Sequence, residues 1–172
     1  MQSLYVKMEA IEKPFVAAHQ ATCVGGGLEL SLSCDFRLAA QSARYSFPEN
    51  KLGSIPASNG VSRLTYLCGV NWAKYMILAA KPLDAQRALV AGLVCEIFPD
   101  ETFETDVLDW CRELAGQPPE MAAIAKLTID LAAETTPDNA KKIERLGQSV
   151  LQIGDEQSAM LEAMKAKLSG KG

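Results

Sequence analysis

The residues of this chain that are best suited to chemistry are two glutamates and three consecutive glycines. Gly25, Gly26 and Gly27 precede a short apolar stretch. Backbone N–H groups at the start of a helix, with no Cβ in the way, stabilise a negatively charged oxygen. Glu29 lies between two leucines, where an unpaired carboxylate is costly, and Glu49 follows a proline. Two carboxylates that face one pocket can act as general base and general acid on one substrate.

Each feature also has a purely structural interpretation. The glycines can form a tight turn between a strand and a helix, because they match neither the G-x-G-x-x-G motif nor a P-loop. Glu29 can lie on the one solvated face of its helix, and Glu49 can be an exposed turn residue. The residues alone therefore leave a catalytic and a structural role open.

The composition excludes several classes of protein. The chain has 172 residues, a formal net charge of -4 and a single histidine, His19. It contains no basic block to grip nucleic acid, no apolar run near the ~20 residues of a membrane span, and no visible secretory signal. One imidazole cannot build a histidine-rich metal site, so no metal is expected. We interpret His19 as a core residue whose hydrogen bonds are satisfied.

The five cysteines favour a cytoplasmic protein with reduced thiols. They are odd in number, have no C-x-x-C spacing, and most have apolar neighbours in the sequence. We therefore expect core residues at Cys23, Cys34, Cys68, Cys95 and Cys111.

Short strands and helices alternate in the first part of the chain, and amphipathic helices fill the rest. This pattern predicts an α/β core with a helical C-terminal subdomain, divided as residues 1–99 and 100–172. Asp84 and Ser58 or Asn59 are candidate helix caps, and Gly69 and Gly92 are candidate helix stops. The predicted strands cover 15–18, 36–39, 44–47 and 94–98, and the predicted helices cover 3–12 and 28–32, then begin near 58, 71 and 84.

An ordered run of motifs resembles the enoyl-CoA hydratase/isomerase (crotonase) family. The resemblance covers nearly the whole chain and implies a crotonase-like ββα spiral core, here incomplete, followed by a helical subdomain for oligomerisation. The motifs occupy residues 13–18, 25–30, 34–39, 47–49, 52–56, 60–64 and 88–94.

The resemblance implies roles for single residues. Gly26 matches the family's second oxyanion-hole donor, and Glu29 and Glu49 match the two catalytic glutamates of its hydratases. There the Glu29 position activates water for attack on the β-carbon of a 2-enoyl-CoA thioester, and the Glu49 position supplies the proton to the α-carbon. The substrate is then an acyl-CoA, and no further cofactor is expected. The same resemblance predicts substrate-binding positions at Gly25, Gly27 and Pro56.

The chain also departs from the family pattern. Glycines are common in the family where Ala21 and residues 57–59 stand here, and its members carry a further N-terminal third with the first oxyanion-hole donor. We therefore expect a truncated form that is a poor hydratase by itself. The apolar faces of residues 15–18 and 28–32 would be covered by the 1–12 helix, by another copy of the chain or by an N-terminal partner segment.

Other functions remain open at this point. The family assembles through its helical part, which implies a homo-trimer or a hexamer. One alternative to the hydratase is a non-catalytic half-crotonase that serves as a binding or assembly module. Another is an isomerase or a different thioester chemistry of the same family, such as a thioesterase or decarboxylase.

Overall fold

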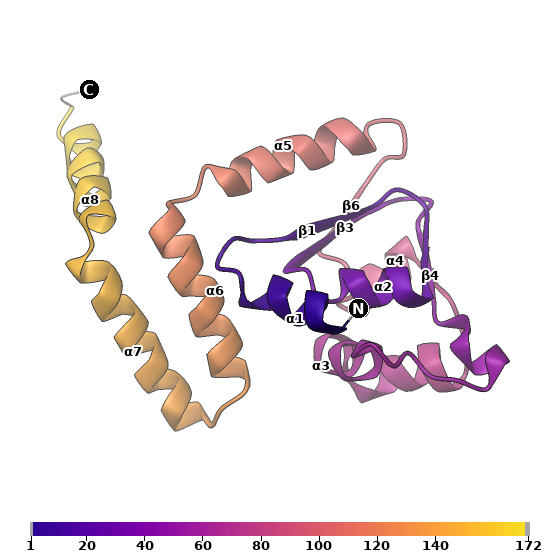
Figure 1. Ribbon diagram of the computed structural model, residues 1–172. Helices are drawn as coiled ribbons and strands as arrows, with labels where there is room; N and C mark the ends of the chain where they lie inside the picture. The colour runs from indigo at the N-terminus through magenta and orange to yellow at the C-terminus, as the bar shows by residue number, and fades with distance from the viewer. Residues whose placement is uncertain (1, 171–172) are drawn as a thin grey trace. The chain divides into compact units, whose positions relative to one another are not determined.

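The computed structural model describes residues 2–170 (Figure 1). These residues form two compact units, of which the first ends at Leu114 and the second begins at Ala115. The elements of the first unit are α1 Gln2–Ala10, β1 Val16–His19, β2 Thr22–Val24, α2 Gly25–Ser31, β3 Phe36–Ala40, β4 Arg44–Ser46, the 3₁₀ helix η1 Pro48–Leu52, α3 Gly60–Ala73, the π-helical turn η2 Lys74–Leu78, β5 Leu83–Asp84, α4 Ala85–Val90, β6 Glu96–Phe98 and α5 Phe103–Ala115. The second unit holds α6 Pro119–Ala133, α7 Pro137–Ile153 and α8 Asp155–Leu168.

Two small sheets organise the first unit. Strands β1, β3 and β6 form one parallel sheet, and β2, β4 and β5 form the other, in which β2 and β4 are parallel and β5 is antiparallel. Strand β1 pairs with β3 and β2 pairs with β4, so each of the first two strands pairs with the next strand but one. The first two strand pairs, β1–β2 and β3–β4, therefore lie beside each other, with their first strands in one sheet and their second strands in the other. Strand β5 then joins the second sheet and β6 joins the first.

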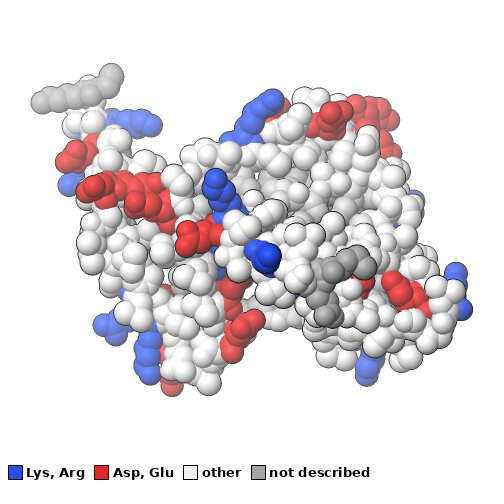
Figure 2. Space-filling model, viewed as in Figure 1, with Lys and Arg blue, Asp and Glu red and all other residues white. Residues whose placement is uncertain are grey.

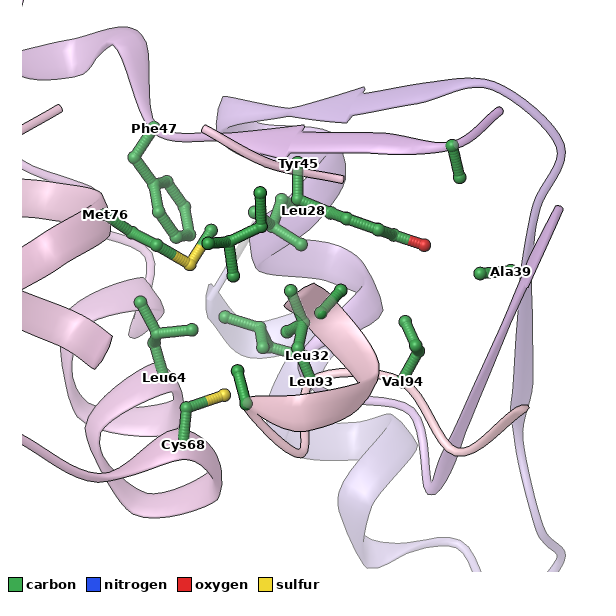
Figure 3. Close-up of a cluster of buried hydrophobic side chains, with 14 of the residues drawn as sticks. Leu28, Leu32, Ala39, Tyr45, Phe47, Leu64, Cys68, Met76, Leu93 and Val94 are labelled. Atoms are coloured by element: carbon green, nitrogen blue, oxygen red, sulfur yellow. The ribbon is translucent and has the colours of Figure 1, made fainter. Parts of the chain in front are cut away.

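The main core lies between the second sheet and helices α2, α3 and α4. Apolar side chains of α2, α3 and the β4–η1 segment point into a common interior (Figure 3). Removing such side chains from water is the main force that stabilises the unit. The largest fully buried members of this core are Leu28, Tyr45, Phe47, Leu64, Met76, Leu83 and Leu93.

Helix α5 covers the sheet of β1, β3 and β6. Its buried residues Phe103 and Val107 pack against Leu38, and Trp110 meets Phe36 edge to face with ring centroids 5.1 Å apart. Because of these contacts, α5 belongs to the first unit. The predicted division into an α/β core of residues 1–99 and a helical subdomain of residues 100–172 for oligomerisation stays a prediction.

The second unit is a small array of helices. Gly147 lets α7 approach α6 closely, because a Cβ there would lie 2.7 Å from Thr128 Oγ1. The carboxylate of Glu156 on α8 accepts hydrogen bonds from the backbone N–H groups of Glu120 and Met121, at 3.3 and 3.1 Å. These are N–H groups at the start of α6, which have no acceptor inside their own helix.

The surface is mixed in charge. On the face drawn in Figure 2, Lys and Arg side chains are scattered among acidic and uncharged residues. Among residues 2–170, no helix has both the length and the apolar character that crossing a membrane requires.

Most predicted elements are confirmed, and a few are corrected. Asp84 caps α4 by accepting a hydrogen bond from the Arg87 N–H at 2.8 Å, as expected. Asn59 occupies the N-cap of α3, but its side chain makes no cap bond. Gly69, predicted as a helix stop, is a kink within α3. Strands β2 and β5 were not predicted, because segments of two or three residues show no periodicity.

The expectation of buried cysteines is wrong for one residue. All five cysteines are free thiols, Cys68 is buried, and Cys95 is exposed. The other three are half-buried. Cys95 directly precedes β6, whose first residue is also exposed, so its apolar neighbours in the sequence do not make it a core residue.

His19 is a core residue, but its hydrogen bonds are not all satisfied. Its Nδ1 lies 3.1 Å from the Tyr45 hydroxyl, whereas Nε2 is buried with no hydrogen-bond partner among the described residues. The expectation of full satisfaction is therefore wrong for Nε2. Burial, and then the nearby charge of Arg37, lower the pKa of His19 from 6.5 to about 4.

The buried histidine should make stability depend on pH. Because His19 binds its proton near pH 6.5 when unfolded and near pH 4 when folded, the unfolded chain holds more protons between those values. The free energy of unfolding should therefore fall by about 3 kcal/mol as the pH drops through this window. Urea unfolding of the wild type and of His19→Val, at a series of pH values from 7.5 to 4, measures this free energy. Parallel curves for the two proteins would contradict the assignment.

Candidate active site

The three glycines form the first turn of α2. The helix begins at Gly25, directly after β2, with Val24 as an extended N-cap that makes no side-chain cap bond. The expectation that the glycines form a turn before the helix is therefore corrected. The N–H groups of a first helical turn have no acceptor within the helix, so they are available to another oxygen.

The space beside two of these glycines is open. A Cβ on Gly26 or Gly27 would meet no atom within 4 Å, and both residues are exposed. On the other side of the turn, the Tyr5 hydroxyl of α1 donates a hydrogen bond of 3.4 Å to the Gly26 carbonyl. Helix α1 thus contacts the glycine turn at the carbonyl oxygen of Gly26.

Glu29 is buried, which excludes the solvated-face interpretation. The residue is 5% exposed, and its Oε1 accepts a 2.7 Å hydrogen bond from the Ser58 N–H. A Cβ on Gly60 would lie 2.8 Å from this same oxygen. The turn before α3 therefore wraps closely around the Glu29 carboxylate.

Glu49 is not an exposed turn residue. It lies in the first turn of η1 and is half-buried. Its Oε1 would be 2.9 Å from a Cβ on Gly25, so the carboxylate rests against the start of α2. Its Oε2 is buried and has no hydrogen-bond partner within residues 2–170. A buried acceptor without a partner is uncommon in native proteins and requires an explanation, of which a catalytic role is one.

The two carboxylates lie along one face of α2. Gly25 and Glu29 are four residues apart, which places them one above the other on a helix. The Glu49 carboxylate of η1 lies against Gly25, and the Glu29 side chain projects from the following turn of α2. The Ser58 N–H donates to the Glu29 carboxylate, whereas the Glu49 carboxylate has a buried oxygen without a hydrogen-bond partner within residues 2–170.

Two predicted substrate-binding positions turn out to be internal. Pro56 is fully buried, and its Cβ would lie 2.6 Å from a Cβ on Gly60. Gly25 is buried beneath the Glu49 carboxylate and has a positive φ of 51°. Both shape the site in this structure, and direct contact with a substrate stays a prediction for them.

Sequence reasoning missed the residues that hold the carboxylates in place. Ser58 acts through its backbone N–H, which leaves no signal in the residue type. Arg63 donates to the Ser58 carbonyl and pairs with Glu9, and only its place in the motif at residues 60–64 could have pointed to it. Among residues 2–170, no group of three or more His, Cys, Asp or Glu side chains is arranged to hold a metal ion.

Comparison with known proteins identifies the class. A family model described as enoyl-CoA hydratase/isomerase matches residues 1–167. The mitochondrial enoyl-CoA hydratase of Pongo abelii is 34% identical over 151 residues, covering 87% of this chain and 52% of that protein. The mitochondrial methylglutaconyl-CoA hydratase of Mus musculus is 39% identical over 126 residues, covering 70% of this chain and 40% of that protein.

The solved structures agree. The crystal structure of enoyl-CoA hydratase from Bacillus anthracis superposes with a TM-score of 0.92 at 30% identity, covering 96% of this chain and 64% of that one. The fold is therefore the crotonase fold. The chain belongs to the enoyl-CoA hydratase/isomerase family, and it spans about half the length of the curated relatives named above.

The packing around the site predicts opposite effects for two glycine substitutions. Gly60→Ala should destabilise the protein by about 1–3 kcal/mol, because its Cβ would meet Glu29 and Pro56 at less than 3 Å. Gly26→Ala should leave stability unchanged or raise it by about 0.5–1 kcal/mol, because its Cβ meets nothing and alanine favours a helix. Urea unfolding measures both. Equal losses of stability would show that the two environments are not as described.

Proposed function

We propose that this chain supplies the two catalytic glutamates of an enoyl-CoA hydratase. The observation that carries the proposal is the pair of carboxylates on one face of α2, with Glu29 held by a peptide N–H and Glu49 presenting a buried, unpartnered oxygen. Membership of the family and the names of the relatives support the same reaction. Because the chain spans about half the length of those relatives, the proposal concerns the site that this chain contributes.

The proposed reaction adds water across the double bond of a 2-enoyl-CoA thioester. Glu29 accepts a proton from the water as its oxygen attacks the β-carbon, and Glu49 gives a proton to the α-carbon. The negative charge that develops on the thioester oxygen is stabilised by the N–H of Gly26, in the open first turn of α2. The thioester is the substrate, and the proposal includes no other cofactor.

Amide substitutions test the two roles. In an enzyme that also contains the family's N-terminal third, Glu29→Gln and Glu49→Gln should each lower the hydration rate of crotonyl-CoA by roughly 10²-fold or more, since proton transfer by a positioned side chain contributes that much. Loss of the enoyl absorbance measures the rate. Glu12→Gln, at an exposed glutamate, is the matched control and should hydrate at the wild-type rate.

Two results would overturn the assignment. A Glu29→Gln protein that hydrates crotonyl-CoA at full rate would remove Glu29 from the mechanism. A wild type that shifts the double bond of a 3-enoyl-CoA without hydrating crotonyl-CoA would make the protein an isomerase instead.

We further propose that the protein self-associates as a homo-trimer or a dimer of trimers. Helices α6, α7 and α8 expose many large apolar side chains, among them Ile129, Leu146, Ile153, Met164 and Leu168, which are 60–87% exposed. Soluble monomers rarely keep large apolar patches in contact with water. Light scattering at tens of micromolar should give a mass near three or six chains, and a uniform monomer would contradict the proposal.

A further inference from the structure

Arg63 on α3 connects three parts of the first unit. Its Nε forms an ion pair with Glu9 Oε1 of α1, and its Nη1 donates a 3.3 Å hydrogen bond to the Ser58 carbonyl. The N–H of the same Ser58 donates to Glu29 Oε1 at 2.7 Å. The Arg63 side chain is only 11% exposed, so water competes little for these bonds.

The geometry of a guanidinium suits this position. Its donors lie in one plane at fixed angles, so a carboxylate on one side and a carbonyl on the other are held in a defined relation. The Ser58 carbonyl is followed by Asn59, which has a left-handed φ of 67°. A turn with this conformation needs outside support, because non-glycine residues adopt it at some cost.

Helix α1 anchors the arginine from the other side. The Tyr5 ring is buried and lies under the guanidinium, with its centroid 5.7 Å from Arg63 Cζ. Tyr5 also reaches Gly26 through its hydroxyl, and Glu9 supplies the opposite charge. The same helix thus contacts the glycine turn directly and the Glu29 carboxylate through Arg63 and Ser58.

We propose that Arg63 is a positioning residue for Glu29, anchored by Glu9 and Tyr5 of α1. It fixes the peptide groups on both sides of Ser58, so that the Ser58 N–H keeps the Glu29 carboxylate in one place. The inference rests on the proposed function for its effect on turnover, whereas the link between Arg63 and the Ser58 amide stands by itself.

The direct test is the exchange of the Ser58 amide hydrogen, measured by NMR on the folded protein. Arg63→Met should raise the exchange rate of this amide about tenfold, because the loss of roughly 1.4 kcal/mol of support corresponds to that factor. Glu29→Ala is the positive control, since it removes the acceptor itself. Arg112→Met is the matched control, because Arg112 forms an exposed ion pair with Asp109 on α5.

Conservative variants and kinetics separate positioning from general stability. Arg63→Lys keeps the charge opposite Glu9 but lacks the planar pair of donors, so it should give an intermediate exchange rate. Glu9→Gln should raise the rate less than Arg63→Met does. In hydration of crotonyl-CoA by an enzyme that includes the family's N-terminal third, Arg63→Met should lower kcat roughly tenfold or more with KM within a factor of about two, as expected when a catalytic group is misplaced.

The outcomes are distinguishable. A Ser58 exchange rate in folded Arg63→Met within about twofold of wild type would overturn the inference. If Arg63→Met does not fold, the same measurement on Arg63→Lys and Glu9→Gln decides, and wild-type rates in both would overturn it. An unmutated enzyme that includes the family's N-terminal third and shows no hydratase activity contradicts the proposed function, while the exchange experiment still tests the role of Arg63.

Discussion

The site depends on one constraint, which is that a carboxylate lies buried on a short helix of the core. Glu29 follows the fully buried Leu28 on α2, and an ionised group in such a place is costly unless a donor meets it. The donor is the Ser58 N–H, which comes from a turn far along the chain. This turn requires glycine at position 60, where a Cβ would meet Glu29 and Pro56, and a left-handed backbone at Asn59.

The stacking of the sheets explains why the second carboxylate arrives at the same helix. Strands β2 and β4 are parallel neighbours, with Val24 opposite Ser46 at their ends. The chain therefore leaves both strands at the same edge of the sheet, into α2 after the first and into η1 after the second. This places Glu49 of η1 against Gly25 of α2. The topology, and not the local sequence around Glu49, decides where its carboxylate lies.

The sequence could predict the parts of this protein that periodicity controls. Long amphipathic helices such as α5 and α7 carry their own signal, and Asp84 is a local cap that needs no tertiary information. Strand β2 has no such signal in the sequence, because three residues are too few to show a periodic pattern. Burial of single polar groups was also invisible. Arg37 lies in an apolar strand, and only the structure shows its guanidinium bonded to the carbonyls of Leu93, Ser31 and Cys34.

The candidate site shows the same division between local and distant information. Residue types alone leave a catalytic and a structural role open for Glu29 and Glu49. The resemblance to a family implies catalytic roles for both, but it does not show which groups hold the carboxylates in place. The structure gives the two carboxylates different surroundings, since a peptide N–H occupies one oxygen of Glu29 and an oxygen of Glu49 is buried without a partner. Two chemically identical groups take different roles when their environments differ. The proposed base and acid are thus distinguished by the contacts of Ser58 and Gly25, neither of which contributes a side chain to the reaction.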